Sequence, residues 1–302
     1  MGRWGVALLV ALGVSLAAQA AERFDRPGDY RGALTVQGME RAYLLHVPPA
    51  AKQGAALPLV IALHGGGGDM ERMARDDLFG LISKADRAGF VVAFPNGYSR
   101  LHFGKFATWN AGRCCGAARD RNSDDVGFLR QVIETFAAQA SIDRKRVFAI
   151  GLSNGGMMAY RLACEAPELL RGIMAVAGTD NTVTCAPSRP VAVLHIHARD
   201  DDHVLFKGGR GPAAVNADLV TDFTSVPATI EKWTRLNRAG VAKPVLTFSG
   251  AACTRSEGAA PVQLCVTENG GHSWPGGAKA RGEAPSQAIR ATDVMWGFFS
   301  GL

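Results

Sequence analysis

A serine flanked by glycines is the strongest chemical signal in the sequence. Ser153 lies in Gly-Leu-Ser-Asn-Gly-Gly at 151–156, between an apolar run at Val147 to Ile150 and a predicted helix that begins at Asn154. Only small residues fit around a serine in such a tight strand-to-helix turn, which presents the hydroxyl at the positive end of the helix dipole. We therefore predict that Ser153 is a nucleophile and that the N–H of Asn154 donates to an oxyanion. The alternative is a serine that only caps the helix.

A second glycine-rich segment, His64 followed by Gly65 to Gly68, comes directly after the apolar run Pro58 to Leu63. Glycines at this point let a backbone N–H approach the carbonyl oxygen of a substrate, as in an oxyanion loop. The N–H of Gly65 or Gly66 is the expected second donor. His64 is expected to orient the loop rather than to transfer protons, and a flexible loop without function is the alternative.

A serine nucleophile needs a general base, and His272 is the candidate. It lies in Gly-Gly-His-Ser-Trp-Pro-Gly-Gly at 270–277, after the predicted strand Val262 to Thr267, and it is the only histidine beyond position 203. Glycines on both sides suit a loop that swings a histidine over the edge of a sheet. A histidine on the surface without function is the alternative.

Three consecutive carboxylates, Asp200, Asp201 and Asp202, follow the predicted strand Val191 to Ile196. An acid that holds the base is expected between the serine and the histidine in chain order, and these residues meet that condition. Spacing alone does not choose among the three. A metal site is the other hypothesis, because His195 and His197 share one face of the strand and Asp200 to His203 lie beyond them.

Trp109 and Trp274 flank the predicted site in the sequence. Either indole could stack on an aromatic acyl group or line an apolar substrate cleft. Packing in the core is the alternative for each of them.

These residues need a scaffold, and the rest of the chain predicts one in which strands and helices alternate. The expected strands are Gly32 to Gln37, Arg41 to Val47, Pro58 to Leu63, Phe90 to Phe94, Val147 to Ile150, Val191 to Ile196, Val245 to Ser249 and Val262 to Thr267, with Ala175 to Ala177 leading into another. The expected helices are Asp77 to Ala88, Asp124 to Ala140, Asn154 to Cys164, Ser225 to Arg238 and Ser286 to Phe299. This order predicts an α/β fold with a mainly parallel sheet and helices on both faces. We expect one domain over residues 21–302.

The first residues resemble a secretory signal. Arg3 precedes an apolar run from Val6 to Ala17, and Ala18-Gln19-Ala20 offers a cleavage site. We expect residues 1–20 to be removed and the protein to be secreted or periplasmic, without a stable membrane anchor. The net charge is +6, but the basic residues are scattered among acidic ones. No basic surface that would bind nucleic acid is therefore expected. The oligomeric state is left open.

Six cysteines occur, none in a CxxC pair: Cys114, Cys115, Cys164, Cys185, Cys253 and Cys265. In an exported chain this favours disulfides over a structural zinc site. Cys114 and Cys115 are not expected to bridge each other, because neighbouring side chains diverge on a trans backbone. They are expected to reach Cys164 and Cys185 in an order that stays open, and Cys253 is expected to pair with Cys265.

Together these segments resemble the extracellular esterases grouped as polyhydroxybutyrate depolymerase-like, which are close to the feruloyl and acetyl-xylan esterases of the first carbohydrate esterase family. The resemblance runs through LHGGGG at 63–68, FPNG at 94–97, WNAGRCCG at 109–116, DDVGFL at 124–129, the segment 142–169, LHIHARDDDHV at 194–204 and GGHSWPGG at 270–277. It implies an α/β-hydrolase fold, with the family's nucleophile on Ser153 and its base on His272. The family's acid pattern H-G-T-x-D-x-x-V selects Asp201, although Ala198 and Arg199 replace the usual Gly and Thr.

The resemblance also implies an activity, the hydrolysis of carboxylic esters in two steps through an acyl-enzyme. Neither a metal nor an organic cofactor is expected. Hydroxyalkanoate oligomers of the polyhydroxybutyrate type are the favoured substrates, and feruloyl or acetyl-xylan esters are the alternative. A serine peptidase on the same fold and a non-catalytic binding protein are the rival classes.

Overall fold

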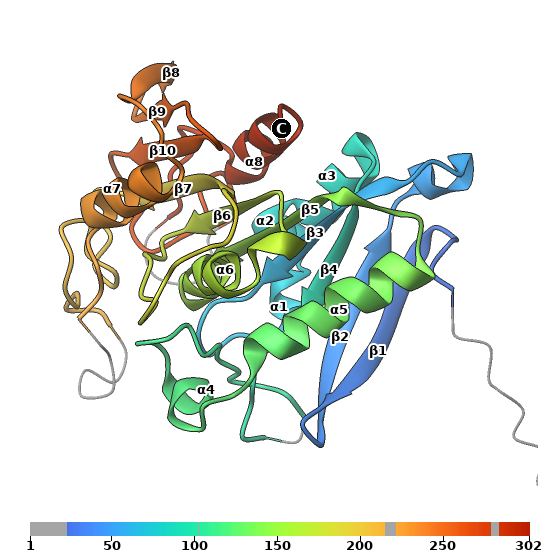
Figure 1. Ribbon diagram of the computed structural model, residues 1–302. Helices are drawn as coiled ribbons and strands as arrows, with labels where there is room; N and C mark the ends of the chain where they lie inside the picture. The colour runs from blue at the N-terminus through green and yellow to red at the C-terminus, as the bar shows by residue number, and fades with distance from the viewer. Residues whose placement is uncertain (1–22, 102, 215–221, 279–283) are drawn as a thin grey trace, which may run out of the picture.

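Ten strands form one twisted sheet in the computed structural model of the chain, which describes residues 23–101, 103–214, 222–278 and 284–302 (Figure 1). The strand order is β1-β2-β4-β3-β5-β6-β7-β10-β9-β8. Six neighbours in the middle run parallel: β4 (Val91–Pro95), β3 (Leu57–Leu63), β5 (Ile142–Leu152), β6 (Gly172–Val176), β7 (Ala192–Ala198) and β10 (Val262–Thr267). The expected signal at 1–20 lies outside the described residues.

The burial of each strand follows from its place in the sheet. Every residue of β3 and β7 is buried, as expected for short apolar runs that are covered on both faces. The outer strands are antiparallel, with β1 (Gly28–Val36) and β2 (Met39–Val47) at one edge and β9 (Ala251–Ser256) and β8 (Lys243–Phe248) at the other. Exposure alternates along β1, which fits an antiparallel strand with one face in solvent.

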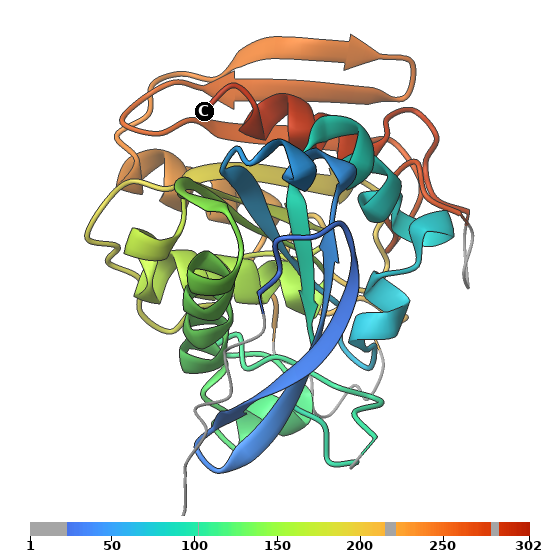
Figure 2. The ribbon, with the colours of Figure 1, turned by 90° about the vertical axis from the view of Figure 1, so that its right-hand side faces the viewer.

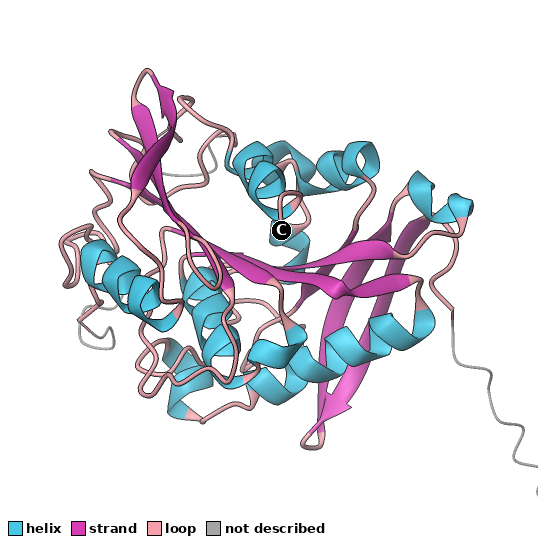
Figure 3. Cartoon of the chain, turned by 45° about the horizontal axis from the view of Figure 1, so that its top comes forward, coloured by secondary structure: helices cyan, strands magenta, loops and turns pink. Residues whose placement is uncertain are grey.

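Helices cover both faces of the sheet, which Figure 3 shows nearly edge-on. On one face lie α5 (Asp125–Gln139), α6 (Asn154–Glu165) and α7 (Val226–Leu236), and on the other lie α1 (Met70–Met73), α2 (Asp76–Phe79), α3 (Leu81–Ala88) and α8 (Ala291–Phe299). Alternate residues of β3 supply the two cores, with Leu59 and Ile61 in one and Val60 and Ala62 in the other. The predicted α/β architecture is therefore confirmed. Among the described residues, no helix has the length and apolarity to cross a membrane.

Three predicted elements need correction. The segment Asp77 to Ala88 belongs to two helices, because Gly80, with a φ of 64°, ends α2 before α3 begins. The strand expected around Ala175 to Ala177 is β6, which begins earlier, at Gly172, and ends at Val176. The last helix begins at Ala291 rather than Ser286, since the N–H of Ala291 donates to the carbonyl of Pro275 instead of to a preceding helical turn. Short one-turn elements complete the chain: η1 (Pro49–Gln53), α4 (Gly116–Asp120) and η2 (Pro167–Leu169).

The strand β9 has no counterpart among the predicted strands. Its sequence, Ala-Ala-Cys-Thr-Arg-Ser, lacks the apolar run that marks the central strands, and its pairing with β8 and β10 defines it instead. Figure 2 shows the β8–β9 hairpin along the upper edge of the molecule. All six residues of β8 are exposed.

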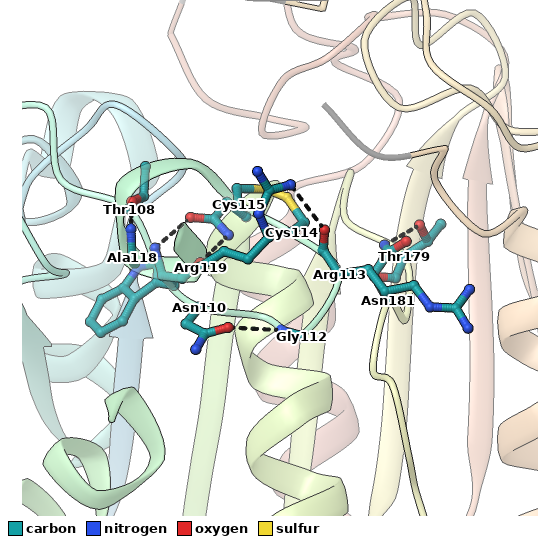
Figure 4. The surroundings of a disulfide bond; sticks show 12 residues. Thr108, Asn110, Gly112, Arg113, Cys114, Cys115, Ala118, Arg119, Thr179 and Asn181 are labelled. Carbon is teal, nitrogen blue, oxygen red and sulfur yellow. Dashed lines mark hydrogen bonds between the residues drawn. A yellow bond between two sulfur atoms is a disulfide. The ribbon is translucent and has the colours of Figure 1, made fainter. Parts of the chain in front are cut away.

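The disulfides differ from the expected pattern in one respect. Cys114 and Cys115 bond to each other, so the expectation that they reach Cys164 and Cys185 is wrong (Figure 4). That expectation assumed a trans backbone, whereas the peptide bond between them is cis and their Cα atoms lie 3.1 Å apart. Cys164 pairs with Cys185, which joins the end of α6 to the loop after β6. The expected pair Cys253–Cys265 is confirmed, between partner residues of β9 and β10.

Candidate active site

Ser153 lies in the turn between β5 and α6 with a backbone that few residues adopt. Its φ is 54° and its ψ is −122°, a conformation that costs a non-glycine residue about 1–3 kcal/mol. The N–H of Ser153 donates to the carbonyl of Val176 at 2.7 Å, and its side chain makes no hydrogen bond that caps α6. A helix cap therefore does not account for this serine, whose side chain is half-buried at the carboxyl edge of the sheet.

Two glycines let this turn close. A Cβ at Gly151 would collide with the backbone of Gly155, and a Cβ at Gly155 would collide with the carbonyl oxygens of Leu63 and His64. The helix α6 thus approaches the end of β3 closely. As a result the loop after β3 lies beside the serine, and a Cβ at Gly65 would be 3.6 Å from the Cβ of Ser153.

His64 holds this loop from the buried side. Its Nε2 accepts the N–H of Gly97 at 2.9 Å, so Nδ1 carries the proton and donates to the carbonyl of Gly65 at 2.8 Å. Burial lowers the pKa of His64 to about 4, although the bond to Gly65 opposes this effect. A neutral histidine with both nitrogens engaged has the orienting role that the sequence predicts.

The direction of the Gly65 carbonyl determines the direction of the Gly66 N–H. In a trans peptide the N–H of Gly66 is directed opposite to the carbonyl of Gly65, and therefore away from His64. Within the described residues, the N–H groups of Gly66 and Asn154 donate no hydrogen bond that the structure shows to another backbone group, and no side chain caps α6. A Cβ at Gly66 would be 3.5 Å from the Cβ of Asn154, so the two unused donors are neighbours.

Trp109, in the core, is hydrogen-bonded both to Asn154 at the start of α6 and to His64 at the start of the glycine-rich loop. The Asn154 side chain accepts the N–H of Trp109 at 2.7 Å and donates to its carbonyl at 2.9 Å. The indole N–H of Trp109 donates to the carbonyl of His64 at 3.0 Å. Trp109 is fully buried, so the alternative of core packing accounts for it.

Asp201 and His272 meet at the carboxyl ends of β7 and β10. Nδ1 of His272 lies 2.9 Å from Oδ2 of Asp201. Of the three consecutive carboxylates only Asp201 is buried. Asp200 accepts the N–H of Gly271 at 3.0 Å, and Asp202 lies 2.6 Å from Nδ1 of His203.

Hydrogen bonds keep Asp201 ionised. Burial raises the pKa of its carboxyl, but hydrogen bonds from His197 and His272 outweigh burial and hold the pKa below its usual range. The backbone N–H groups of His203 and Val204 also donate to Oδ1, both at 2.9 Å. The carboxylate can therefore stabilise a positive charge on His272.

The ring nitrogens of His195 and His197 are all engaged with protein partners, among them Tyr160 and the carbonyl of Val204. These contacts favour a structural role over the metal hypothesis. Asp201, His203 and His272 do have ligand atoms within 4.8 Å of one another, as a cation would require. Both oxygens of Asp201 already accept protein N–H groups, which a cation would have to displace.

Two residues without a predicted catalytic role lie near this site: His203, which was part of the metal hypothesis only, and Tyr160. The ring of His203 stacks on that of His272, with centroids 4.7 Å apart and planes 13° apart. His203 directly follows the three aspartates, which is why the metal hypothesis included it. Tyr160 carries no local signal, because its partner His195 is 35 residues away in the chain.

A cleft of about 390 Å³ opens beside these residues. Its lining comprises Arg72, Leu78, Phe79, Leu152, Asp202, His203, Ala213, Gly270, His272, Ser273, Trp274, Ala278 and Pro285. Trp274 thus faces the cleft while its indole N–H donates to Thr292 at 3.2 Å. A cavity of similar size, about 420 Å³, lies at the opposite edge near Leu57 and Val91, away from these groups.

A mainly parallel sheet with an elbow serine and an aspartate–histidine pair at its carboxyl edge is the architecture of the α/β-hydrolases. The acetyl xylan esterase from Aspergillus awamori superposes with a TM-score of 0.61 over 90% of this chain and 100% of that one. At 13% identity this likeness shows the fold alone.

Sequence similarity narrows the class. The profile of the family described as Esterase PHB depolymerase matches residues 41–229. "Putative esterase NocK" of Nocardia uniformis subsp. tsuyamanensis is 33% identical over 261 residues, 81% of this chain and 73% of that protein. "Probable feruloyl esterase C" of Aspergillus niger is 29% identical over 216 residues, 68% of this chain and 73% of that protein. The chain belongs to the polyhydroxybutyrate depolymerase esterase family and is a carboxylic ester hydrolase, which confirms the resemblance found in its motifs.

Proposed function

We propose that the protein hydrolyses esters through a triad of Ser153, His272 and Asp201. The observation that carries this proposal is the 2.9 Å hydrogen bond between His272 Nδ1 and Asp201 Oδ2. Because that bond keeps a proton on Nδ1, Nε2 is left to remove the proton of a nucleophile. Nε2 of His272 has no protein partner among the described residues, and Leu152, next to Ser153, lines the same cleft as His272.

The reaction then follows from the positions of these groups. Ser153 attacks the ester carbonyl while His272 takes its proton, and the amides of Asn154 and Gly66, with Gly65 beside them, receive the oxyanion. Each such donor contributes roughly 3–4 kcal/mol in hydrolases studied by mutation. His272 next protonates the leaving alcohol, and water releases the acyl group by the reverse sequence. No step calls for a metal or an organic cofactor.

Short hydroxyalkanoate esters are the proposed substrates. The cleft has apolar walls at Leu78, Phe79 and Trp274, which suit an aliphatic chain. Arg72 also lines this cleft, and among the described residues its guanidinium has no ion-pair partner. A free guanidinium suits a carboxylate, which every hydroxyalkanoate oligomer carries at its acid end.

Feruloyl esters are the second candidate. The similarity to "Probable feruloyl esterase C" favours them, and the ring of Trp274 in the cleft could stack on an aromatic acyl group. The two candidates differ in charge, since a methyl ferulate or acetylated xylo-oligosaccharide gives Arg72 no carboxylate to bind.

Export is part of the proposal. The three disulfides are typical of proteins that fold in an oxidising compartment. We infer that residues 1–20 are a cleaved signal and that 21–302 form one catalytic domain, which acts in the periplasm or outside the cell on soluble esters.

Three experiments test the proposal. Ser153→Ala and His272→Ala should each lower kcat on p-nitrophenyl butyrate by several orders of magnitude while the fold survives, and an organophosphate should label Ser153 in a mass spectrum. Turnover that survives in Ser153→Ala would refute the proposed nucleophile. A kcat/KM tenfold higher for methyl ferulate than for a hydroxybutyrate dimer, about 1.4 kcal/mol, would favour the second candidate.

A further inference from the structure

A row of buried polar side chains runs behind the proposed triad acid. Tyr160 lies on α6, the helix that begins after Ser153, and its hydroxyl is 2.9 Å from Nδ1 of His195 on β7. Nε2 of His195 is in turn 3.0 Å from Nδ1 of His197, on the same face of β7. The helix of the nucleophile is thus connected to the strand that leads to Asp201.

The row ends on two acceptors. Nε2 of His197 lies 2.8 Å from the carbonyl oxygen of Val204 and 3.3 Å from Oδ2 of Asp201. Neither of these oxygens can donate, so Nε2 of His197 must carry a proton. This end of the row therefore fixes the tautomer of His197.

One direction of hydrogen bonding follows for the whole row. With its proton on Nε2, His197 accepts at Nδ1, and His195 must donate from Nε2. His195 then accepts at Nδ1, and the hydroxyl of Tyr160 donates to it. Each polar atom is satisfied in this arrangement.

Burial holds the row in that state. Tyr160 and His195 are inaccessible to solvent, and His197 is 1% exposed. Burial raises the pKa of Tyr160 and lowers the pKa of His195 well below its usual range, so both stay neutral. Buried polar groups are costly unless all are satisfied, and a satisfied network is rigid and specific.

We propose that Tyr160, His195 and His197 are positioning residues that set the plane of the Asp201 carboxylate toward His272. This inference rests on the proposed triad. Two amides hold Oδ1 of Asp201, and Nε2 of His197, which donates to the carbonyl of Val204, lies 3.3 Å from Oδ2, so protein donors surround both oxygens of the carboxylate. Tyr160 acts at the far end, where its hydroxyl donates to Nδ1 of His195 and so holds the His195 ring in place against His197.

Tyr160→Phe tests the role of the row while keeping the ring. Without the hydroxyl, Nδ1 of His195 lacks a donor and the His195 ring is no longer held in place, so the His197 ring that it supports beside Asp201 is held less firmly. We expect kcat to fall about tenfold with KM unchanged, which is the upper end of the range for the loss of one hydrogen bond between neutral groups. The downfield proton resonance of His272 Nδ1–H should shift or broaden.

A pair of variants at His197 tests the same role even if Tyr160→Phe does not fold. The amide of His197→Gln can still donate toward Asp201, so kcat should stay within about fivefold of wild type, whereas His197→Met should lose about a hundredfold. Thr229→Val is the matched control, because it removes a buried hydroxyl that accepts the N–H of Asp180 outside the row. It should lower the melting temperature without changing kcat.

The outcomes separate this inference from the proposed triad. A normal kcat and an unchanged His272 resonance in Tyr160→Phe would overturn the positioning role, as would equal losses in His197→Gln and His197→Met. If Ser153→Ala retains turnover, the triad itself fails. The resonance can be followed in Ser153→Ala as well, because it reports the His272–Asp201 bond without turnover.

Discussion

Replacing Asp201 by asparagine tests the triad sharply, because the contacts around the carboxylate dictate how the new amide must sit. Oδ1 accepts the backbone N–H groups of His203 and Val204, both at 2.9 Å. Only the oxygen of an asparagine can accept there, so its NH₂ group takes the place of Oδ2. That group then faces Nδ1 of His272, which donates in the wild type.

Two donors cannot share a hydrogen bond, so His272 must move its proton from Nδ1 to Nε2. The nitrogen that should accept the proton of Ser153 is then already protonated. In a serine protease with the same exchange kcat falls about 10⁴-fold. We expect a similar loss here, about 5 kcal/mol of transition-state stabilisation.

The assay is kcat for p-nitrophenyl butyrate at neutral pH, with thermal unfolding measured on the same samples. Asp200→Asn and Asp202→Asn are the matched controls, because both side chains are exposed and neither contacts His272. An asparagine at 200 can still accept the N–H of Gly271, so both controls should stay close to wild type. The reasoning is refuted if Asp201→Asn keeps more than about a tenth of kcat, or if either control loses as much.

Three further predictions concern stability, covalent structure and specificity. The pKa of His64 is lowered to about 4 in the folded chain, against about 6.5 in the unfolded chain. As the pH falls below 6.5, the unfolded state binds a proton that the folded state does not, so the free energy of unfolding decreases. Urea titrations at pH 7 and 5 should show the wild type losing about 2 kcal/mol more than His64→Gln, and equal losses would contradict the buried neutral histidine. Tryptic digestion of the denatured, unreduced protein should release residues 114–119 as one peptide that is lighter than its reduced form by two hydrogen atoms, and a cross-link from Cys114 to another peptide would refute the pairing. Arg72→Gln should lower kcat/KM about tenfold for the free acid of a hydroxybutyrate dimer and leave its methyl ester unchanged, and equal losses on both would remove the carboxylate role.

The parts of the fold that the sequence predicts are those with a local physical signature. The apolar run of β3 and the glycines around Ser153 can each be recognised within a few residues, because burial on both faces and a tight turn restrict composition directly. The order of the residues in the chain predicted an acid between Ser153 and His272, among three consecutive aspartates. The bond to His272 singles out Asp201 among its neighbours, in line with the family pattern.

Features that depend on residues far away in the sequence have no such local signature, so the sequence did not predict them. The strand β9 is defined by pairing with β8 and β10 rather than by its own residues. The buried position of Trp109 depends on His64 and Asn154, which lie far from it in the sequence. The pairing of Cys114 with Cys115 and of Cys164 with Cys185 is not indicated by residue type or spacing.

The close contact at Gly155 bears on how this enzyme can change under selection. A side chain at Gly151 or Gly155 meets main-chain atoms, which cannot move aside, so mutation has almost no room in the turn that carries Ser153. The cleft, by contrast, takes its walls from separate segments, with Arg72 on α1 and Trp274 in the loop after β10. New substrate ranges should therefore arise, in the laboratory or in nature, from substitutions in those walls, while the turn around Ser153 stays unchanged.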